Sequence, residues 1–100
     1  MAIEINWSDK AQQDRKEIFK YWNNRNKSNE YSKKLNILIN YSVNYLKEFP
    51  TIGRDSGYEG IRYLIVRDYL VFYINYTDSI TILRVWDGRR DPELLPQLFV

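Results

Sequence analysis

The spacing of apolar residues changes once along this chain, and that change limits the folds the chain can adopt. Between Ser8 and Phe49 apolar side chains recur every three or four residues, as on one face of a helix. After Gly60 they alternate with other residues or form short runs, which is typical of strands. The sequence therefore predicts helices in the first half and a sheet built mainly from the second half.

A short strand and a helix are predicted at the start of the chain. Residues 2–7 alternate between apolar and other side chains, which indicates a strand with one buried face. Ser8 is the expected N-cap of the first helix, because its hydroxyl can accept a bond from a free amide of the first turn. That helix should end near Trp22 or Asn23, before a polar break over 23–27. Its apolar stripe comprises Ala11, the Arg15 stem, Ile18, Phe19 and Trp22.

A second helix should follow the polar break and lie antiparallel to the first. Ser28 is its expected N-cap, and Pro50 should end it, because a proline pushes the preceding residue out of the helical region. The residues expected to face the core are Tyr31, Leu35, Leu38, Ile39, Ser42, Tyr45, Leu46 and Phe49.

Three strands are predicted after a loop over 51–59, and tight turns at 67–68 and 77–78 connect them. The strands should span 61–66, 69–76 and 80–86. A chain of 100 residues has room for a single core, so one domain over 1–100 is expected. The predicted fold class is α+β in the order β-α-α-β-β-β, with a helix hairpin packed on a mostly antiparallel sheet. The stretch 88–100 is predicted to be a short tail.

The composition excludes several classes of function. The chain has no cysteine and no histidine, so a thiol nucleophile, a zinc–cysteine site and a Ser-His-Asp triad are all impossible. No phosphate-binding loop or zinc-ligand spacing is present, and Asp87 with Asp91 would offer a metal ion only two carboxylates, so neither a cofactor nor a metal is expected. The first residues lack a signal-peptide pattern, and no apolar run could cross a membrane. We therefore expect a cytoplasmic protein that does not interact with membranes.

Arginine side chains are the main candidates for function, since every cation after Lys47 is an arginine. Arg89 and Arg90 follow the last predicted strand, where they can project toward a partner. Arg62 and Arg84 alternate with apolar neighbours inside strands, so each is either ion-paired or part of a polyanion site. We predict a structural role for Arg62, through a carboxylate, and target binding for Arg84, Arg89 and Arg90.

The second face of the predicted sheet carries more apolar surface than the helix hairpin can cover. Phe72, Ile74 and Trp86 cannot all point toward the helices. A large apolar patch on a small protein usually marks a binding surface. These three residues are therefore predicted to bind a partner protein.

Four segments resemble the ParE branch of the RelE/ParE superfamily, the toxins of bacterial type II toxin–antitoxin pairs. They are residues 49–54 (FPTIGR), 60–64 (GIRYL), 69–73 (YLVFY) and 82–91 (ILRVWDGRRD). Each motif is short, but all four occur in the family's order. One departure is Asp87, which stands where ParE sequences usually have histidine. The resemblance implies the same α+β fold and a small antitoxin that wraps across the toxin, bound here by Phe72, Ile74 and Trp86.

The resemblance implies one of two activities. ParE toxins are not enzymes and inhibit DNA gyrase, whereas RelE toxins cleave mRNA on the ribosome. The arginine that follows the middle-strand tyrosine in RelE is replaced here by Leu70, and the RelE lysines are absent. A non-enzymatic gyrase inhibitor is therefore expected. The alternatives are a RelE-like, ribosome-dependent mRNA endonuclease and an inactive homologue that only binds antitoxin. The chain is expected as a homodimer or as a toxin–antitoxin hetero-oligomer.

Overall fold

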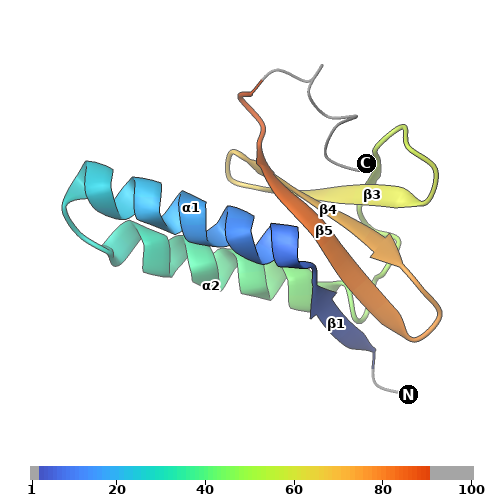
Figure 1. Cartoon of the computed structure of the whole chain (residues 1–100). Helices are drawn as coiled ribbons and strands as arrows, with labels where there is room; N and C mark the ends of the chain where they lie inside the picture. Colours follow the sequence, from blue (N-terminus) through green and yellow to red (C-terminus); the bar gives the residue numbers. More distant parts are fainter. Residues whose placement is uncertain (1–2, 91–100) are drawn as a thin grey trace.

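A helical hairpin lies against one face of a five-stranded sheet in this computed structural model, which describes residues 3–90 (Figure 1). The elements are β1 (Glu4–Trp7), α1 (Asp9–Asn26), α2 (Glu30–Tyr45), β2 (Arg54–Asp55), β3 (Ile61–Val66), β4 (Tyr69–Asn75) and β5 (Ser79–Asp87). The sheet order is β1-β5-β4-β3-β2; β1 pairs in parallel with β5, and the other pairs are antiparallel. The predicted fold class and element order are confirmed, with the two-residue strand β2 added.

The N-terminal end of α1 is joined to the sheet by Ser8. Its hydroxyl oxygen accepts a bond from the Ala11 amide at 3.0 Å, as expected of an N-cap. The same hydroxyl donates to the Leu83 carbonyl at 2.8 Å, and the Ser8 amide donates to the Ile82 carbonyl at 2.9 Å. One residue therefore starts the helix and fixes its position beside β5.

The helix boundaries differ from the sequence prediction at both sides of the hairpin. α1 continues through the asparagine-rich stretch to Asn26, and Lys27 ends it in the left-handed conformation with φ 54°. Asparagine is a poor helix former, but Asn23 accepts a 2.6 Å bond from Ser32 across the hairpin. This tertiary contact stabilises the extra turn. The N-cap of α2 is Asn29, so the prediction of Ser28 was wrong.

The core face of α2 also differs from the predicted one. Its buried residues are Ser32, Leu35, Ile39 and Val43, and Leu46 follows directly after the helix. Tyr45 and Phe49, predicted to face the core, are 42% and 48% exposed. α2 ends at Tyr45 rather than next to Pro50, because the chain tightens into a turn over 46–48. The true stripe runs through Val43, which the prediction left out.

The sheet carries apolar residues on both faces. On the helix side, Val71, Tyr73, Ile80, Ile82 and Val85 join the buried helix residues in one cluster. Phe72 and Trp86 form a second cluster with partly buried neighbours such as Leu70 and Leu83. The apolar run of β4 therefore contributes to two separate clusters, as expected for a central strand.

A β-bulge in β5 changes the direction of its side chains. Phe72 lies opposite Arg84 while Tyr73 lies opposite Ile82, so Leu83 is an extra residue. Ile82 and Val85 both reach the helix-side core even though they are three positions apart. Without the bulge, simple alternation would place Arg84 in that core. The bulge instead lets Arg84 turn toward α1.

Gly53 lies where the loop after α2 meets the core, and we expect alanine there to destabilise the fold by about 2 kcal/mol. A Cβ at Gly53 would lie 2.5 Å from the Tyr73 hydroxyl oxygen. That hydroxyl accepts a bond from the Gly53 amide at 3.0 Å and donates to the Pro50 carbonyl at 2.9 Å. The clash would therefore break buried hydrogen bonds as well as packing.

Equilibrium unfolding in urea would measure the loss at Gly53. Gly60→Asn is the matched control, because Gly60 has φ 75° with no atom near its Cβ position, and asparagine tolerates that conformation. The control should cost less than about 1 kcal/mol. Equal losses in the two variants would contradict the steric argument.

Candidate functional site

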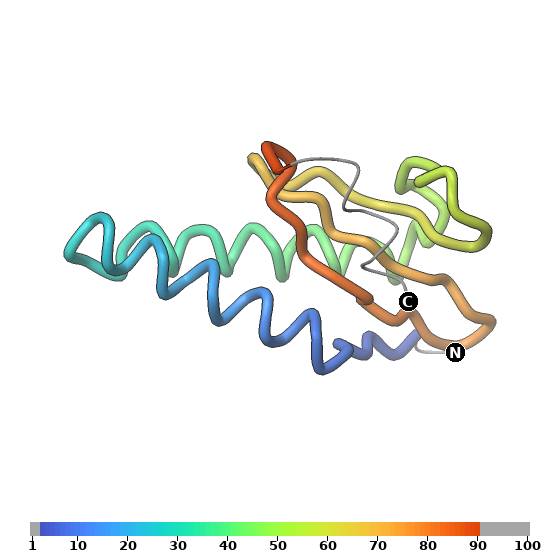
Figure 2. Tube along the Cα trace, turned by 45° about the horizontal axis from the view of Figure 1, so that its top comes forward, coloured from blue at the N-terminus to red at the C-terminus, as the bar shows by residue number. Residues whose placement is uncertain are grey.

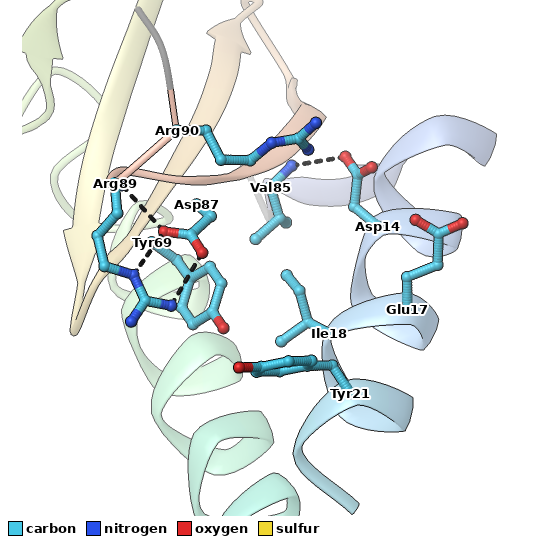
Figure 3. A pocket seen from close by; sticks show the side chains of 9 residues that line it. All are labelled: Asp14, Glu17, Ile18, Tyr21, Tyr69, Val85, Asp87, Arg89 and Arg90. Carbon is cyan, nitrogen blue, oxygen red and sulfur yellow. Dashed lines mark hydrogen bonds and ion pairs between the residues drawn. The ribbon is translucent and has the colours of Figure 1, made fainter. Parts of the chain in front are cut away.

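A pocket of about 350 Å³ lies between α1 and the end of β5 (Figure 3). α1 supplies one wall, the first residue of β4 supplies part of the floor, and the end of β5 with the following turn closes the other side. The lining residues are Asp14, Glu17, Ile18, Tyr21, Tyr69, Val85, Asp87, Arg89 and Arg90. The α1 residues have the spacing i, i+3, i+4 and i+7, which places them on one helix face. That spacing could have revealed this wall, which the sequence prediction missed.

Arg89 is held at the pocket by Asp87. The Arg89 Nε and Nη2 atoms donate to the two oxygens of the Asp87 carboxylate at 3.0 and 2.9 Å. The Arg89 amide also donates to Asp87 Oδ1 at 2.9 Å, and this bond fixes the turn. Both side chains still contact solvent, with Arg89 55% and Asp87 26% exposed. The guanidinium is therefore oriented but accessible, and it lies beside Tyr69 (Figure 3).

Arg90 lies on the other side of the same turn. Its guanidinium carbon is 4.3 Å from the centre of the Trp86 ring, within the range of a cation–π contact. The Gly88 amide donates to the Asp68 carbonyl at 2.7 Å, so this turn is tied to the turn between β3 and β4. The predicted pair Arg89 and Arg90 thus projects from a braced turn, and both residues line the pocket.

Arg84 does not line the pocket, because Asp14 engages its guanidinium. Nε and Nη2 of Arg84 donate to the Asp14 carboxylate at 2.8 and 2.9 Å. The Asp14 carboxylate also accepts the Val85 amide at 3.0 Å, at the edge that β5 exposes beyond its pairing with β1. The hydrogen bond to Asp14 is the main reason that the pKa of Arg84 is raised. This geometry is that of a structural brace, and contact between Arg84 and a target stays a prediction.

Arg62 lies away from the pocket and bonds to the backbone. Its Nη1 donates to the Gly53 carbonyl at 2.9 Å. Among residues 3–90 no ion pair joins Arg62 to a carboxylate, so the predicted carboxylate anchor stays a prediction. The bond to the Gly53 carbonyl fastens β3 to the loop that holds Gly53 against Tyr73.

The residues predicted to bind an antitoxin differ in exposure. Phe72 is 1% exposed, Trp86 is also buried, and Ile74 is half-buried. Their role in binding stays a prediction. Most of the large apolar side chains that are open to solvent lie instead on α2, the loop after it, and β3. They include Ile37, Tyr41, Tyr45, Phe49, Ile52 and Ile65.

Tyr69 places a hydroxyl at the pocket floor. The Trp22 indole nitrogen donates to this hydroxyl oxygen at 2.7 Å. Burial raises the pKa of Tyr69 above its ordinary value, so the hydroxyl keeps its proton at neutral pH and can donate a hydrogen bond to a partner. The pocket therefore combines a tyrosine hydroxyl, two arginines and an apolar floor of Ile18 and Val85.

Within residues 3–90 no group of three or more acidic side chains is placed so that it could hold a metal ion. Asp91, which could have paired with Asp87 around a metal, lies outside the described residues. Neither helix in the described part of the chain is long and apolar enough to span a membrane.

Comparison with known proteins identifies the family. The family model described as "ParE toxin of type II toxin-antitoxin system, parDE" matches residues 5–92. This chain belongs to the ParE toxin family. The resemblance predicted from its four motifs is thereby confirmed, and the ParE family description implies an antitoxin as partner.

A solved structure supports the ParE fold independently. The chain from "Chromosomal ParDE TA system from P. aeruginosa" superposes with a TM-score of 0.74 at 22% sequence identity. The match covers 86% of the present ParE chain and 96% of the solved one. At this identity the likeness shows the fold alone. No curated protein sequence matches the chain.

We expect the ion pair between Asp87 and Arg89 to be detectable as a lowered pKa of the Asp87 carboxyl. The bond from Arg89 lowers the pKa of the Asp87 carboxyl below its usual range. An Asp whose folded pKa is lowered stabilises the fold above its unfolded pKa of about 4, and that stability is lost as pH falls through the folded value. We expect a small effect, because the pair is exposed.

NMR titration of the side-chain carboxyl carbon would measure this pKa directly. Arg89→Ala should raise the Asp87 pKa back toward its usual value. Arg67→Ala, which removes an exposed arginine from another turn, should leave the pKa unchanged. An unchanged Asp87 pKa in Arg89→Ala would contradict the bidentate pair.

Proposed function

We propose that this ParE-family chain arrests growth by binding DNA gyrase without catalysing a reaction, and that a cognate antitoxin neutralises it. The observation that carries the proposal is the braced turn after β5, where Arg89 and Arg90 flank a pocket and remain exposed. Arginines that are oriented before binding lose less conformational freedom when a partner engages them. Such a turn suits recognition of acidic or polar groups on a protein.

The chemistry of the pocket supports binding rather than catalysis. Arginine does not give up its proton in proteins, so neither Arg89 nor Arg90 can act as a general base. The Asp87 carboxyl has a lowered pKa, and the Tyr69 hydroxyl has a raised one, so neither is poised for proton transfer near pH 7. Asp14 is engaged by Arg84 and the Val85 amide. The properties of these five side chains favour a contact surface over a nuclease centre.

A supercoiling assay tests the proposed target. Purified gyrase and relaxed plasmid would be titrated with the chain. Loss of supercoiling, with cleaved DNA trapped on the enzyme, is the expected result. Unaffected gyrase at an excess of folded chain would contradict the proposal. Mapping of mRNA ends after induction would then test the nuclease alternative, since cuts inside codons on ribosomes belong to that activity.

The antitoxin part of the proposal has its own test. The product of the neighbouring open reading frame should co-purify with the chain and restore supercoiling when added to the gyrase assay. A structure of the complex would then show which apolar residues the antitoxin contacts. Contact with Phe72, Ile74 and Trp86 would support the sequence-based assignment, whereas contacts confined to α2 and β3 would overturn it.

A further inference from the structure

The end of the α1–α2 hairpin carries a concentration of positive charge that the proposed function does not use. Residues 20–34 contain five cations and one acid, a net charge of +4. The whole chain carries +2, so the remaining residues together carry −2. The cations are Lys20, Arg25, Lys27, Lys33 and Lys34, and the acid is Glu30. We refer to these five cations as the hairpin cations.

The hairpin cations are open to solvent. All five are exposed, and the hairpin end projects beyond the sheet (Figures 1 and 2). Within residues 3–90 the salt bridges are those of Arg84 and Arg89, so no hairpin cation is neutralised by a described carboxylate. Arg25 bonds to the Tyr21 hydroxyl at 3.2 Å and lies 5.7 Å from the Trp22 ring, and neither contact cancels its charge.

The positive charge at this end comes from side chains rather than from helix dipoles. The C-terminus of α1 and the N-terminus of α2 meet here, so their partial charges oppose each other. Three exposed asparagines, Asn24, Asn26 and Asn29, add amide donors without adding charge. A surface of lysines, one arginine and asparagines suits oxygen acceptors that bear delocalised negative charge.

We propose that the hairpin cations bind the phosphate backbone of duplex DNA without reading its base sequence. They come from both helices and from the connection between them, so they present a spread of charge rather than one focused site. DNA carries a negative charge about every 1.7 Å along its axis, which matches a spread of cations better than a single carboxylate does. Four of the five are lysines, which bind phosphate as point charges and impose little geometric selectivity. This surface is separate from the pocket flanked by Arg89 and Arg90.

Fluorescence anisotropy with a labelled short DNA duplex and no gyrase tests the proposal. Binding should be measurable at about 50 mM salt and should weaken steeply toward about 200 mM. If three hairpin cations lie on phosphates, the plot of log affinity against log salt should have a slope of about −3. Absence of binding at low salt would overturn the proposal, whatever the outcome of the gyrase assay.

A charge-matched pair of variants locates the contact. K20Q/K33Q/K34Q should lower the affinity at about 50 mM salt by at least about tenfold and flatten the slope by about 2 to 3. K10Q/K47Q/R54Q removes the same charge from exposed positions outside the hairpin end and should leave the slope nearly unchanged. Equal losses in the two variants would mean that only net charge matters and would overturn the assignment. Thermal unfolding should be similar for both.

A competition experiment distinguishes nucleic acid from an acidic protein segment. Unlabelled duplex DNA should displace the labelled duplex at much lower charge concentration than polyglutamate does. Displacement by polyglutamate at equal or lower charge concentration would overturn DNA as the occupant and would favour an acidic partner protein.

Discussion

Replacing Arg89 and Arg90 together by alanine is expected to abolish growth arrest and gyrase inhibition while antitoxin binding stays within about twofold. The two guanidinium groups flank the pocket and are held by neighbours rather than buried, since Asp87 orients Arg89 and Trp86 supports Arg90. Removing oriented arginines from a binding surface typically costs several kcal/mol of affinity. The fold should tolerate the change, because both side chains are exposed.

The matched control is Lys47→Ala with Arg54→Ala. It removes two exposed cations that lie outside the pocket and outside the two turns that hold Arg89 and Arg90 in place. Growth after induction, supercoiling in vitro and the affinity for antitoxin would be measured for both variants. Full toxicity of the Arg89/Arg90 variant would refute the assignment of the target surface, and loss of toxicity in the control would point to net charge instead.

Asp14→Ala is expected to destabilise the fold by about 3 kcal/mol. Asp14 is only 11% exposed and accepts both bonds from Arg84 together with the Val85 amide. Its loss would leave a partly buried guanidinium and a strand-edge amide without their partner. The figure lies at the lower end for broken buried pairs, because Arg84 is 20% exposed and water can reach it in part.

Glu17→Ala is the control for Asp14. Glu17 lies one turn further along α1 and lines the same pocket, but its described side-chain bond is a single one from Gln13 at 3.3 Å. It should cost less than about 1 kcal/mol in urea unfolding. The destabilisation caused by Asp14→Asn should fall between those of the two alanine variants. The asparagine side-chain oxygen can still accept the bond from the Val85 amide, but the side chain has no negative charge to pair with Arg84. A loss at Asp14 no larger than at Glu17 would show that the brace contributes little.

Local patterns predicted most of the fold. β3 was predicted with its observed bounds, because the turn at Arg67 separates two strongly apolar runs, and Arg67 adopts φ 58° there. The Ser8 cap was also visible in the sequence. The end of α1 was not, because Asn23 is held in the helix by Ser32, a contact that requires the folded hairpin. β2 was missed because two exposed residues, Arg54 and Asp55, carry no periodic signal.

The site was predictable where it depends on chain order and unpredictable where it depends on packing. Arg89 and Arg90 follow a strand end, and the sequence alone placed them there. The role of Asp14 depends on the extra residue in β5, which turns Arg84 out of the core and toward α1. The sequence around Arg84 and around Asp14 does not indicate that the two side chains pair, because they lie 70 positions apart in the chain. The same holds for the bond from Arg62 to the Gly53 carbonyl, which depends on how the loop after α2 packs.

The parallel pairing of β1 with β5 has a consequence for synthesis. Glu4 pairs with Ser79, so the ribosome must add 75 further residues after Glu4 before β1 can pair with β5. At roughly 5–20 residues per second, the ribosome needs about 4–15 s to make them. The α1–α2 hairpin depends on closer contacts and can form earlier, but the turn that bears Arg89 and Arg90 emerges only after β5. A partly synthesised chain therefore lacks the turn that we propose as the target-binding surface, and a partner present at the ribosome has seconds in which to bind the chain before that turn exists.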